Sequence, residues 1–214
     1  MNYKIAIFDL DGTILNTIED LADSTNYALK QNGMPERTLE EINSFVGNGI
    51  RKLIERAVPA DTTEENIDKV YKEFSNYYKK HCADKTKPYE GITEVIEELR
   101  KRDIKTAVVS NKADFAVQIL CRDYFPGLFD CCVGDREGQK RKPYPDSVND
   151  VLKKFEIDKE EAVYIGDSDV DIDTARNASM DGITVSWGFR GEEFLRKCGA
   201  NVIVKEPKEL LQYF

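Results

Sequence analysis

The sequence predicts an α/β protein in which an all-helical segment is inserted after the first strand of a parallel sheet. The first observation is a short, mostly apolar run at residues 4–8, typical of a strand buried on both faces. The second is that about seventy residues of helical periodicity follow without a strand between them. The third is that strands and helices alternate beyond Pro88, which favours a doubly wound, Rossmann-like sheet with helices on both faces.

Four helices are expected in the inserted segment. The first runs from Ile18 to Asn32-Gly33, and Thr38 with Glu41 resembles a capping box that starts a short second helix. The third covers residues 50–58, and the fourth covers 66–82 with apolar residues on one face. We therefore assign residues 16–84 to a helical cap domain, and residues 1–15 with 85–214 to the α/β core domain.

The remainder of the chain supplies the other strands and the helices that cover them. Strands are expected at residues 106–109, 129–133, 162–165, 183–185 and 202–204. Helices are expected at residues 92–102, 113–123, 146–155, 170–178 and 208–213. Ligands of such sheets bind at the carboxyl ends of the strands, so the residues at those ends are the candidates for function.

Composition excludes several classes of protein. The 214 residues carry a net charge of -9, which argues against a nucleic-acid-binding surface. No apolar run approaches the roughly 18 residues that a membrane span needs, so no membrane partner is expected. Five cysteines without a secretory signal predict reduced thiols and a cytoplasmic protein. A single histidine disfavours a Ser-His-Asp triad and a multi-histidine metal site.

Two carboxylates follow the first strand in the order Phe8-Asp9-Leu10-Asp11-Gly12-Thr13. Their spacing of two lets both point to the same side, where they repel each other. A divalent cation with a phosphate substrate resolves the repulsion, because Mg²⁺ takes a few carboxylate oxygens and leaves positions for phosphate oxygens. A plain Asp-Gly turn is the alternative.

Acids also follow the strand at 162–165. Asp167 stands at the strand end, and Asp171 lies one turn into the next helix on the same side. A calcium loop of the EF-hand type is excluded, because its sixth position requires Gly and its twelfth requires Glu. Those positions hold Ile172 and Ala178. The segment therefore supplies two further candidate acids to the same edge of the sheet.

Two further segments offer donors for a phosphate. Ser110 and Asn111 follow the strand at 106–109, although these residues taken alone favour an ordinary Ser-Asn turn. Lys142 lies just before a helix, in a stretch that Pro143 and Pro145 stiffen. Lys140 and Arg141 beside it fit a solvated run of charge, and these residues alone do not single out Lys142.

Four matches in chain order resemble the signature motifs of the haloacid dehalogenase superfamily: Asp9-x-Asp11-Gly-Thr, Ser110, Lys142 and Gly166-Asp167-Ser168-x-x-Asp171. They spread over nearly the whole chain, and their joint occurrence is highly specific. Trp187-Gly188-Phe189-Arg190 further resembles the phosphoglycolate phosphatase-like branch. Two positions depart from that branch, which often has Asp at the position of Asn16 and Gly at the position of Ser179.

The resemblance implies a phosphatase with a helical cap. Asp9 would be the nucleophile that forms an aspartyl-phosphate, and Asp11 would act as general acid and then general base. Mg²⁺ is the implied cofactor, held by the Asp9 carboxylate, the Asp11 backbone carbonyl and Asp167, with Asp171 in support. Ser110, Asn111 and Lys142 would bind the phosphate.

The substrate is expected to be a small phosphorylated metabolite, with 2-phosphoglycolate as the best match. In the cap, Asn48 and Arg51 are candidates for a second anionic group of the substrate, although Gly47 and Gly49 around them also fit a plain helix-start turn. A β-phosphoglucomutase-like phosphotransferase, a pyrophosphatase and a sugar or nucleotide phosphatase share the four motifs. A non-catalytic phospho-receiver or binding protein is a more distant alternative. Either a monomer or a homodimer is expected.

Overall fold

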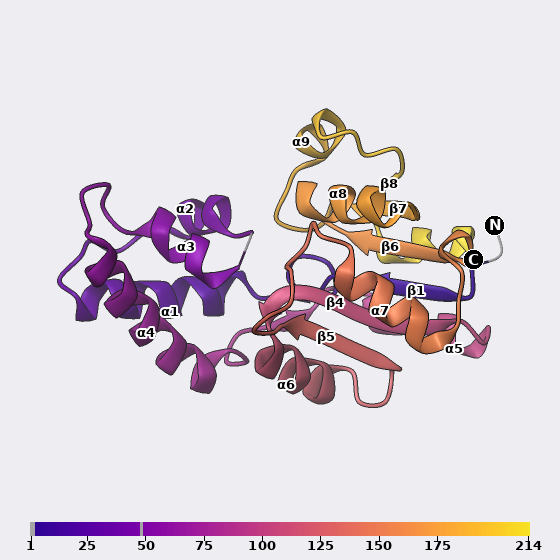
Figure 1. The fold of residues 1–214 in the computed structure, drawn as a ribbon, viewed down its shortest axis with the longest axis horizontal. Coiled ribbons are helices and arrows are strands. Elements are labelled where there is room, and N and C mark those ends of the chain that lie inside the picture. Colours follow the sequence, from indigo (N-terminus) through magenta and orange to yellow (C-terminus); the bar gives the residue numbers. More distant parts are fainter. Residues whose placement is uncertain (1–2, 48) are drawn as a thin grey trace. The chain divides into compact units, whose positions relative to one another are not determined.

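The computed structural model describes residues 3–47 and 49–214 (Figure 1). The chain forms two compact units, one of Met1–Leu15 with Pro88–Phe214 and one of Asn16–Lys87. The chain returns to the first unit after Lys87, whereas the sequence predicted the return after residue 84. Strands β2 (Leu15–Asn16) and β3 (Lys87–Pro88) pair with each other where the chain leaves and re-enters that unit.

The first unit is built on a six-stranded sheet in the order β5-β4-β1-β6-β7-β8, in which all described pairs are parallel. Its strands are β1 (Ile5–Phe8), β4 (Lys105–Ala113), β5 (Cys131–Asp135), β6 (Ala162–Gly166), β7 (Asp181–Val185) and β8 (Ile203–Val204). Strand β1 is central, and its last residue, Phe8, pairs with Val108 and with Ile165. The residues that follow these three strands therefore meet at one edge of the sheet.

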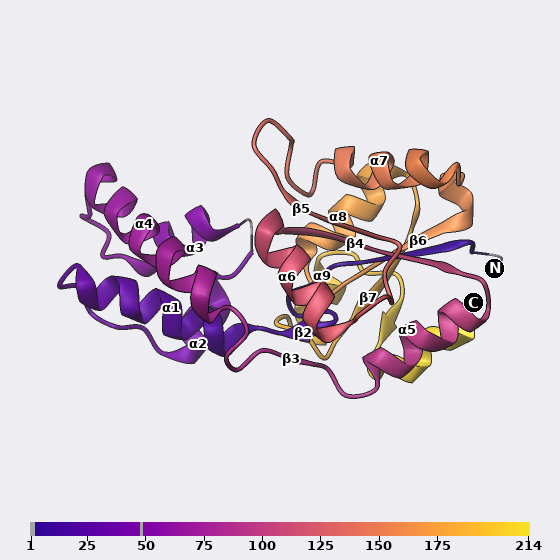
Figure 2. The ribbon, with the colours of Figure 1, turned by 90° about the horizontal axis from the view of Figure 1, so that it is seen from below.

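Helices cover both faces of this sheet (Figure 2). They are α5 (Ile92–Lys101), α6 (Asp114–Tyr124), α7 (Asp146–Phe155), α8 (Asp169–Ala178) and α9 (Glu192–Lys197), with the 3₁₀ helices η1 (Lys159–Glu161) and η2 (Pro207–Tyr213). Ile5 and Ile7 of β1 belong to one buried apolar cluster with Val148 and Val151 of α7 and Ala175 of α8. Helices α5 and η2 lie on the opposite face (Figure 2). The predicted doubly wound α/β class is confirmed.

The described residues of the second unit form four helices, α1 (Ile18–Gln31), α2 (Leu39–Phe45), α3 (Ile50–Ala57) and α4 (Glu64–His81). The capping box predicted for Thr38 and Glu41 is present at the start of α2. Asp20 of α1 is 1% exposed, and its carboxylate accepts hydrogen bonds from the amides of Lys85 and Thr86 at 2.8–3.1 Å. This buried acid ties the first helix of the unit to the segment that follows its last helix.

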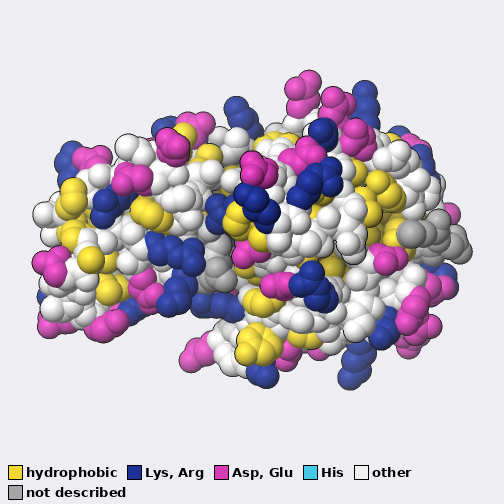
Figure 3. Space-filling view, turned by 90° about the horizontal axis from the view of Figure 1, so that it is seen from above, with side chains coloured by type: hydrophobic (Ala, Val, Ile, Leu, Met, Phe, Trp, Pro, Cys, Tyr) yellow, Lys and Arg dark blue, Asp and Glu magenta, His cyan; other side chains and the backbone are white. Residues whose placement is uncertain are grey.

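Charged side chains of both signs are interspersed on the face that Figure 3 shows. Oppositely charged residues one helical turn apart form exposed pairs, for example Arg196 with Glu192 and Lys197 with Glu193, both at 2.7 Å. Exposed pairs of this kind contribute little to stability, so the buried apolar contacts dominate. None of the helices in residues 3–47 and 49–214 combines the length and apolar character that a membrane span requires.

Several details differ from the prediction. Strand β4 was expected to end at Val109 but continues to Ala113, with an irregular register against β5 in between. The short elements β2, β3 and α9 were not predicted, because two to six residues carry no readable periodicity. The last helix, at Pro207–Tyr213, is 3₁₀ rather than α. The continuation of β4 matters most, because it places Ser110, Asn111 and Lys112 within a strand.

Candidate active site

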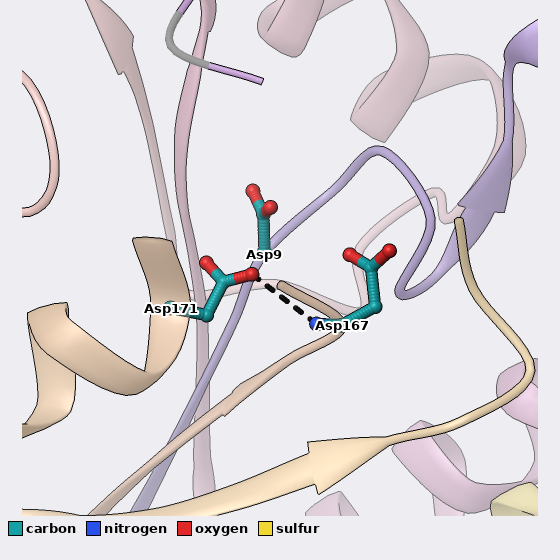
Figure 4. Close-up of side chains that lie close together, drawn as sticks. All are labelled: Asp9, Asp167 and Asp171. Carbon is teal, nitrogen blue, oxygen red and sulfur yellow. Dashed lines mark hydrogen bonds between the residues drawn. The ribbon is translucent and has the colours of Figure 1, made fainter. Parts of the chain in front are cut away.

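Three carboxylates gather at the carboxyl edge of the sheet (Figure 4). Asp9 directly follows β1, Asp167 directly follows β6, and Asp171 lies in the first turn of α8. One carboxylate oxygen from each of the three residues lies within 4.8 Å of the other two. All three residues are buried. The parallel pairing of β1 with β6 aligns the carboxyl ends of the two strands and thereby brings Asp9 close to Asp167.

Close backbone approach makes the cluster possible. Gly12 adopts a φ of +81°, and a Cβ at this position would collide with the Asp167 carboxylate. A Cβ at Gly166 would likewise collide with the side chain of Asp171. Both glycines are therefore required by the acids that pack on them.

Asp9 keeps one carboxylate oxygen free of hydrogen bonds. Its Oδ1 accepts from the Leu10 amide at 2.7 Å and lies 2.9 Å from Lys142 Nζ. Within residues 3–47 and 49–214, no donor is hydrogen-bonded to Asp9 Oδ2. The carboxylate is thus fixed through one oxygen, while the other is available to a ligand.

Lys142 is the cation at the centre of the site. Its Nζ lies 2.8 Å from Asp171 Oδ1 and donates to the Tyr164 hydroxyl at 2.8 Å. Burial disfavours the charged ammonium, but Asp171 and Asp9 together raise the pKa of Lys142 well above its usual value. Asn111 holds the backbone of this lysine, because its side-chain amide accepts from Lys142 N at 2.8 Å and donates to Lys142 O at 3.0 Å.

The two acids near β6 are held by different donors. Asp167 accepts from the Thr13 hydroxyl at 3.1 Å and from the Phe189 amide at 2.8 Å. Asp171 Oδ2 accepts from the Asp167 and Ser168 amides at 3.2 and 3.0 Å, and from the Ser168 hydroxyl at 2.6 Å. With Lys142 on its Oδ1, Asp171 uses both oxygens on the protein. This arrangement suits a residue that orients the site.

The cluster carries excess negative charge. Burial, with the charges of Asp171 and Asp11, raises the pKa of Asp9 to about 6 against the opposing effect of Lys142. Burial together with Asp171 and Asp9 also raises the pKa of Asp167 well above its usual range. Three buried carboxylates share one ammonium, and their oxygens are the hard donors that a small divalent cation prefers. The residues present therefore fit a divalent metal ion.

Asp11 is positioned apart from this triad. Its Oδ1 lies 2.7 Å from Nζ of Lys112, a lysine that is 5% exposed. The hydroxyl of Ser110, also buried, accepts from the Lys112 amide at 3.3 Å. The predicted residues Asp9, Asp11, Ser110, Asn111, Lys142, Asp167 and Asp171 thus all lie at or beside the carboxyl edge of the sheet.

Several contributors were not assigned from the sequence. The sequence assigned no role to Lys112, which follows Ser110 and Asn111, or to Tyr164, which lies in an apolar strand. The Tyr164 hydroxyl donates to the Val109 carbonyl at 2.8 Å and accepts from Lys142. A lysine directly after a buried strand was the one available signal for Lys112. Nothing in the pattern of an apolar strand distinguishes a tyrosine that binds a buried lysine.

The cap candidates belong to the helical unit. Arg51 on α3 pairs with Glu55 at 3.1 Å, with Glu64 at 2.7 Å and with Asp68. Asn48 lies outside the described residues. A role of either residue toward a substrate stays a prediction, and for Arg51 it requires that a substrate compete with three carboxylates.

Known proteins resemble the chain along most of its length. The family model described as haloacid dehalogenase-like hydrolase matches residues 6–185. A phosphoglycolate phosphatase from Nitrosospira multiformis is 32% identical over 217 residues, covering 98% of this chain and 96% of that protein. An N-acetylmuramic acid 6-phosphate phosphatase from Pseudomonas aeruginosa is 29% identical, covering 99% and 94%. The crystal structure of a presumed phosphoglycolate phosphatase from Lactobacillus delbrueckii subsp. bulgaricus has a TM-score of 0.95 at 40% identity, covering 100% and 98%.

Proposed function

The chain belongs to the haloacid dehalogenase-like hydrolases as a phosphatase of the phosphoglycolate phosphatase-like branch, and on that premise we propose a Mg²⁺-dependent phosphomonoesterase. It hydrolyses a small phosphorylated metabolite through an aspartyl-phosphate on Asp9, and 2-phosphoglycolate is its preferred substrate. One observation carries the proposal: Asp9 Oδ2 has no hydrogen bond to the described residues, while Oδ1 is fixed by Lys142 and the Leu10 amide. A nucleophilic carboxylate needs this combination of a fixed side chain and a free oxygen.

In the first step, Asp9 Oδ2 attacks phosphorus opposite the leaving oxygen. The bond from phosphorus to that oxygen breaks, and Asp11 transfers a proton to it, which gives the alcohol and the aspartyl-phosphate. Lys142 lies 2.9 Å from the other Asp9 oxygen, where its charge can stabilise the phosphoryl oxygens. Ser110 at the end of the neighbouring strand offers a hydroxyl to the same oxygens.

In the second step, water attacks the phosphorus and gives a proton to Asp11. The bond from phosphorus to Asp9 breaks, which restores the Asp9 carboxylate and the protonated Asp11 and releases inorganic phosphate. Protons and phosphoryl groups balance over the two steps, because Asp11 donates one proton and regains one. Asp11 must therefore serve both steps from one position.

The metal would be held by Asp9 and Asp167, with the Asp11 backbone carbonyl as a third ligand. Asp171 would orient this set, because both of its oxygens are engaged by Lys142 and by groups at the start of α8. When bound, the ion neutralises negative charge on the phosphoryl group and on the acids. Mg²⁺ suits a site of carboxylate oxygens that keeps positions for phosphate and water.

The substrate assignment rests on similarity to named relatives. The Nitrosospira multiformis relative is a phosphoglycolate phosphatase, which favours 2-phosphoglycolate. The Pseudomonas aeruginosa relative acts on N-acetylmuramic acid 6-phosphate and is similar over almost the same share of the chain, which makes a phosphorylated sugar acid the second candidate. Both substrates combine a phosphate ester with a carboxylate, and Arg51 is the cap residue proposed to receive that carboxylate.

The test is hydrolysis of a panel of phosphate esters with Mg²⁺ or EDTA. We expect 2-phosphoglycolate to be hydrolysed fastest, and we expect EDTA or Asp9→Asn to abolish turnover. Asp173→Asn is the matched control, because Asp173 lies on α8 with its side chain 49% exposed and pairs with Arg176. If N-acetylmuramic acid 6-phosphate is hydrolysed fastest, the proposed mechanism stands and this ester replaces 2-phosphoglycolate as the preferred substrate. Equal turnover by Asp9→Asn would refute the nucleophile.

Arg51→Ala tests the cap assignment. If Arg51 binds the substrate carboxylate, the KM for 2-phosphoglycolate rises about tenfold while that for p-nitrophenyl phosphate does not change, since one charged contact is worth about 1.4 kcal/mol or more. An unchanged KM for 2-phosphoglycolate would remove Arg51 from the site.

A further inference from the structure

Among the described residues, two lysines are buried, and each is paired with one acid of the Asp9-x-Asp11 motif. Lys142 pairs with Asp9 at 2.9 Å, and Lys112 pairs with Asp11 at 2.7 Å. The Lys112 side chain is 2% exposed, and that of Asp11 is 18% exposed. A buried ammonium requires a charged partner, so this pair fixes both side chains.

The backbone around Lys112 is held tightly. Strand β4 carries it past Val109 through an irregular register against β5, and α6 begins at Asp114 immediately afterwards. The Lys112 amide donates to Ser110 Oγ at 3.3 Å. A Cβ at Gly134 of β5 would lie 2.7 Å from the Lys112 carbonyl oxygen, so the two strands are in close contact there. The side chain of Lys112 thus extends to Asp11 from a backbone that is held in place.

We propose that Lys112 is a positioning residue for the proton transfers of Asp11, an inference that rests on the proposed function. The ammonium holds Asp11 Oδ1 and thereby fixes the orientation of the carboxyl group that exchanges protons with the leaving group and with water. Without Lys112 the Asp11 side chain can rotate about its own bonds. Its carboxyl proton is then no longer held in one orientation toward the leaving oxygen. The role assigned to Lys112 acts through its ion pair with Asp11.

Substrates with different leaving groups can distinguish a role of Lys112 in proton transfer from a merely structural role. An alkyl phosphate such as 2-phosphoglycolate expels a strongly basic alkoxide and depends on protonation of the leaving oxygen. An aryl phosphate such as p-nitrophenyl phosphate expels a weakly basic phenolate and needs little protonation. Loss of the proton donor therefore slows the first ester much more than the second.

The experiment compares Lys112→Met with wild type on both esters, in the presence of Mg²⁺. We expect kcat/KM for 2-phosphoglycolate to fall about 100-fold and that for p-nitrophenyl phosphate to fall less than about threefold, since general acid catalysis contributes roughly 10²–10⁴-fold. The retained aryl activity also shows that the variant is folded. Lys112→Arg, which keeps the charge, should recover most of the alkyl activity.

A double variant completes the test. In Asp11→Asn, the further change Lys112→Met should have no effect on the alkyl ester, because a positioning residue has nothing left to position. Equal losses on the two esters, or an additive loss in the double variant, would overturn the inference and assign Lys112 to folding or phosphate binding. A wild-type protein that hydrolyses neither ester would overturn the proposed function itself, and that result is separate from any comparison among variants.

Discussion

Acids stand at both ends of the sheet, half-buried at one end and buried at the other, and the two ends balance their charge in opposite ways. At the amino end, Asp130 precedes β5 and accepts from the Thr106 amide at 3.0 Å, with Arg100 at 2.9 Å and Lys105 at 3.2 Å. At the carboxyl end, Asp9, Asp167 and Asp171 lie together, and Lys142 pairs with Asp9 and Asp171. The negative charge of one acid beside two cations is fully balanced, which fits a structural role. Three acids beside one cation keep a net negative charge, which fits a site that binds a cation.

The pKa shifts follow the same division. Burial opposes ionisation of Asp130, but the Thr106 amide, Lys105 and Arg100 lower its pKa overall. Burial and neighbouring acids instead raise the pKa of Asp9 to about 6 and raise that of Asp167. Burial and charge balance together therefore separate an acid that stabilises this fold from one that is available for chemistry.

The largest effect is expected from Lys142→Met, which removes the single cation shared by the three acids. The rate of ester hydrolysis should fall by about 10³-fold, because the loss of a charged donor to the transition state is compounded by repulsion among the acids. Steady-state kinetics on p-nitrophenyl phosphate measures the loss. The matched control is Lys140→Met, since Lys140 is exposed two positions away. A Lys142→Met enzyme within tenfold of wild type would contradict the central role of this lysine.

A divalent cation should stabilise the carboxyl end and leave the amino end unaffected. At about 100 times its Kd, Mg²⁺ should raise the free energy of unfolding by about 2.7 kcal/mol, provided that it binds only the folded state. Thermal unfolding with and without EDTA measures this change. Asp167→Asn should abolish the Mg²⁺ effect, and Asp130→Asn should retain it. Retention of the effect by Asp167→Asn would place the ion elsewhere.

The smallest effect is expected at Asp130. Its lowered pKa contributes stability that is present above the unfolded pKa of about 3.9 and is lost as pH falls through the lower folded pKa. Asp130→Asn should therefore cost about 1 kcal/mol at pH 7 after allowance for solvent screening, with no loss of activity. Urea titrations from pH 7 to pH 2 should show the difference from wild type shrinking in acid. A constant difference would mean that the Asp130 charge contributes nothing.

The acids of the site could be predicted from the sequence, whereas most of the residues that hold these acids in place could not. Asp9 and Asp167 follow apolar strands, and the topology of a parallel sheet brings such ends together. Lys142 could be chosen among three neighbouring cations only through the family resemblance. The fold explains the choice, since Lys142 is buried while Lys140 is exposed and Arg141 pairs with Asp135 at 2.6 Å.

Other features depend on contacts that no local pattern encodes. Lys112 reaches Asp11 because β4 continues through an irregularity, and a propensity-based strand boundary at Val109 missed it. Tyr164 looks like any apolar residue of a buried strand until its hydroxyl is seen between Lys142 and the Val109 carbonyl. The pairing of β2 with β3 joins segments that are distant in the sequence.

The most direct test of the account is chemical identification of the phosphorylated residue. Wild-type protein with Mg²⁺ and a fast aryl phosphate is quenched in acid within its first turnover, digested and analysed by mass spectrometry, with Asp9→Asn as the control. The account predicts one acid-stable, base-labile phosphoryl group on the peptide that contains Asp9, and none in the variant. A phosphoryl group on another residue would contradict it. Turnover by the Asp9→Asn variant at the wild-type rate would contradict it as well.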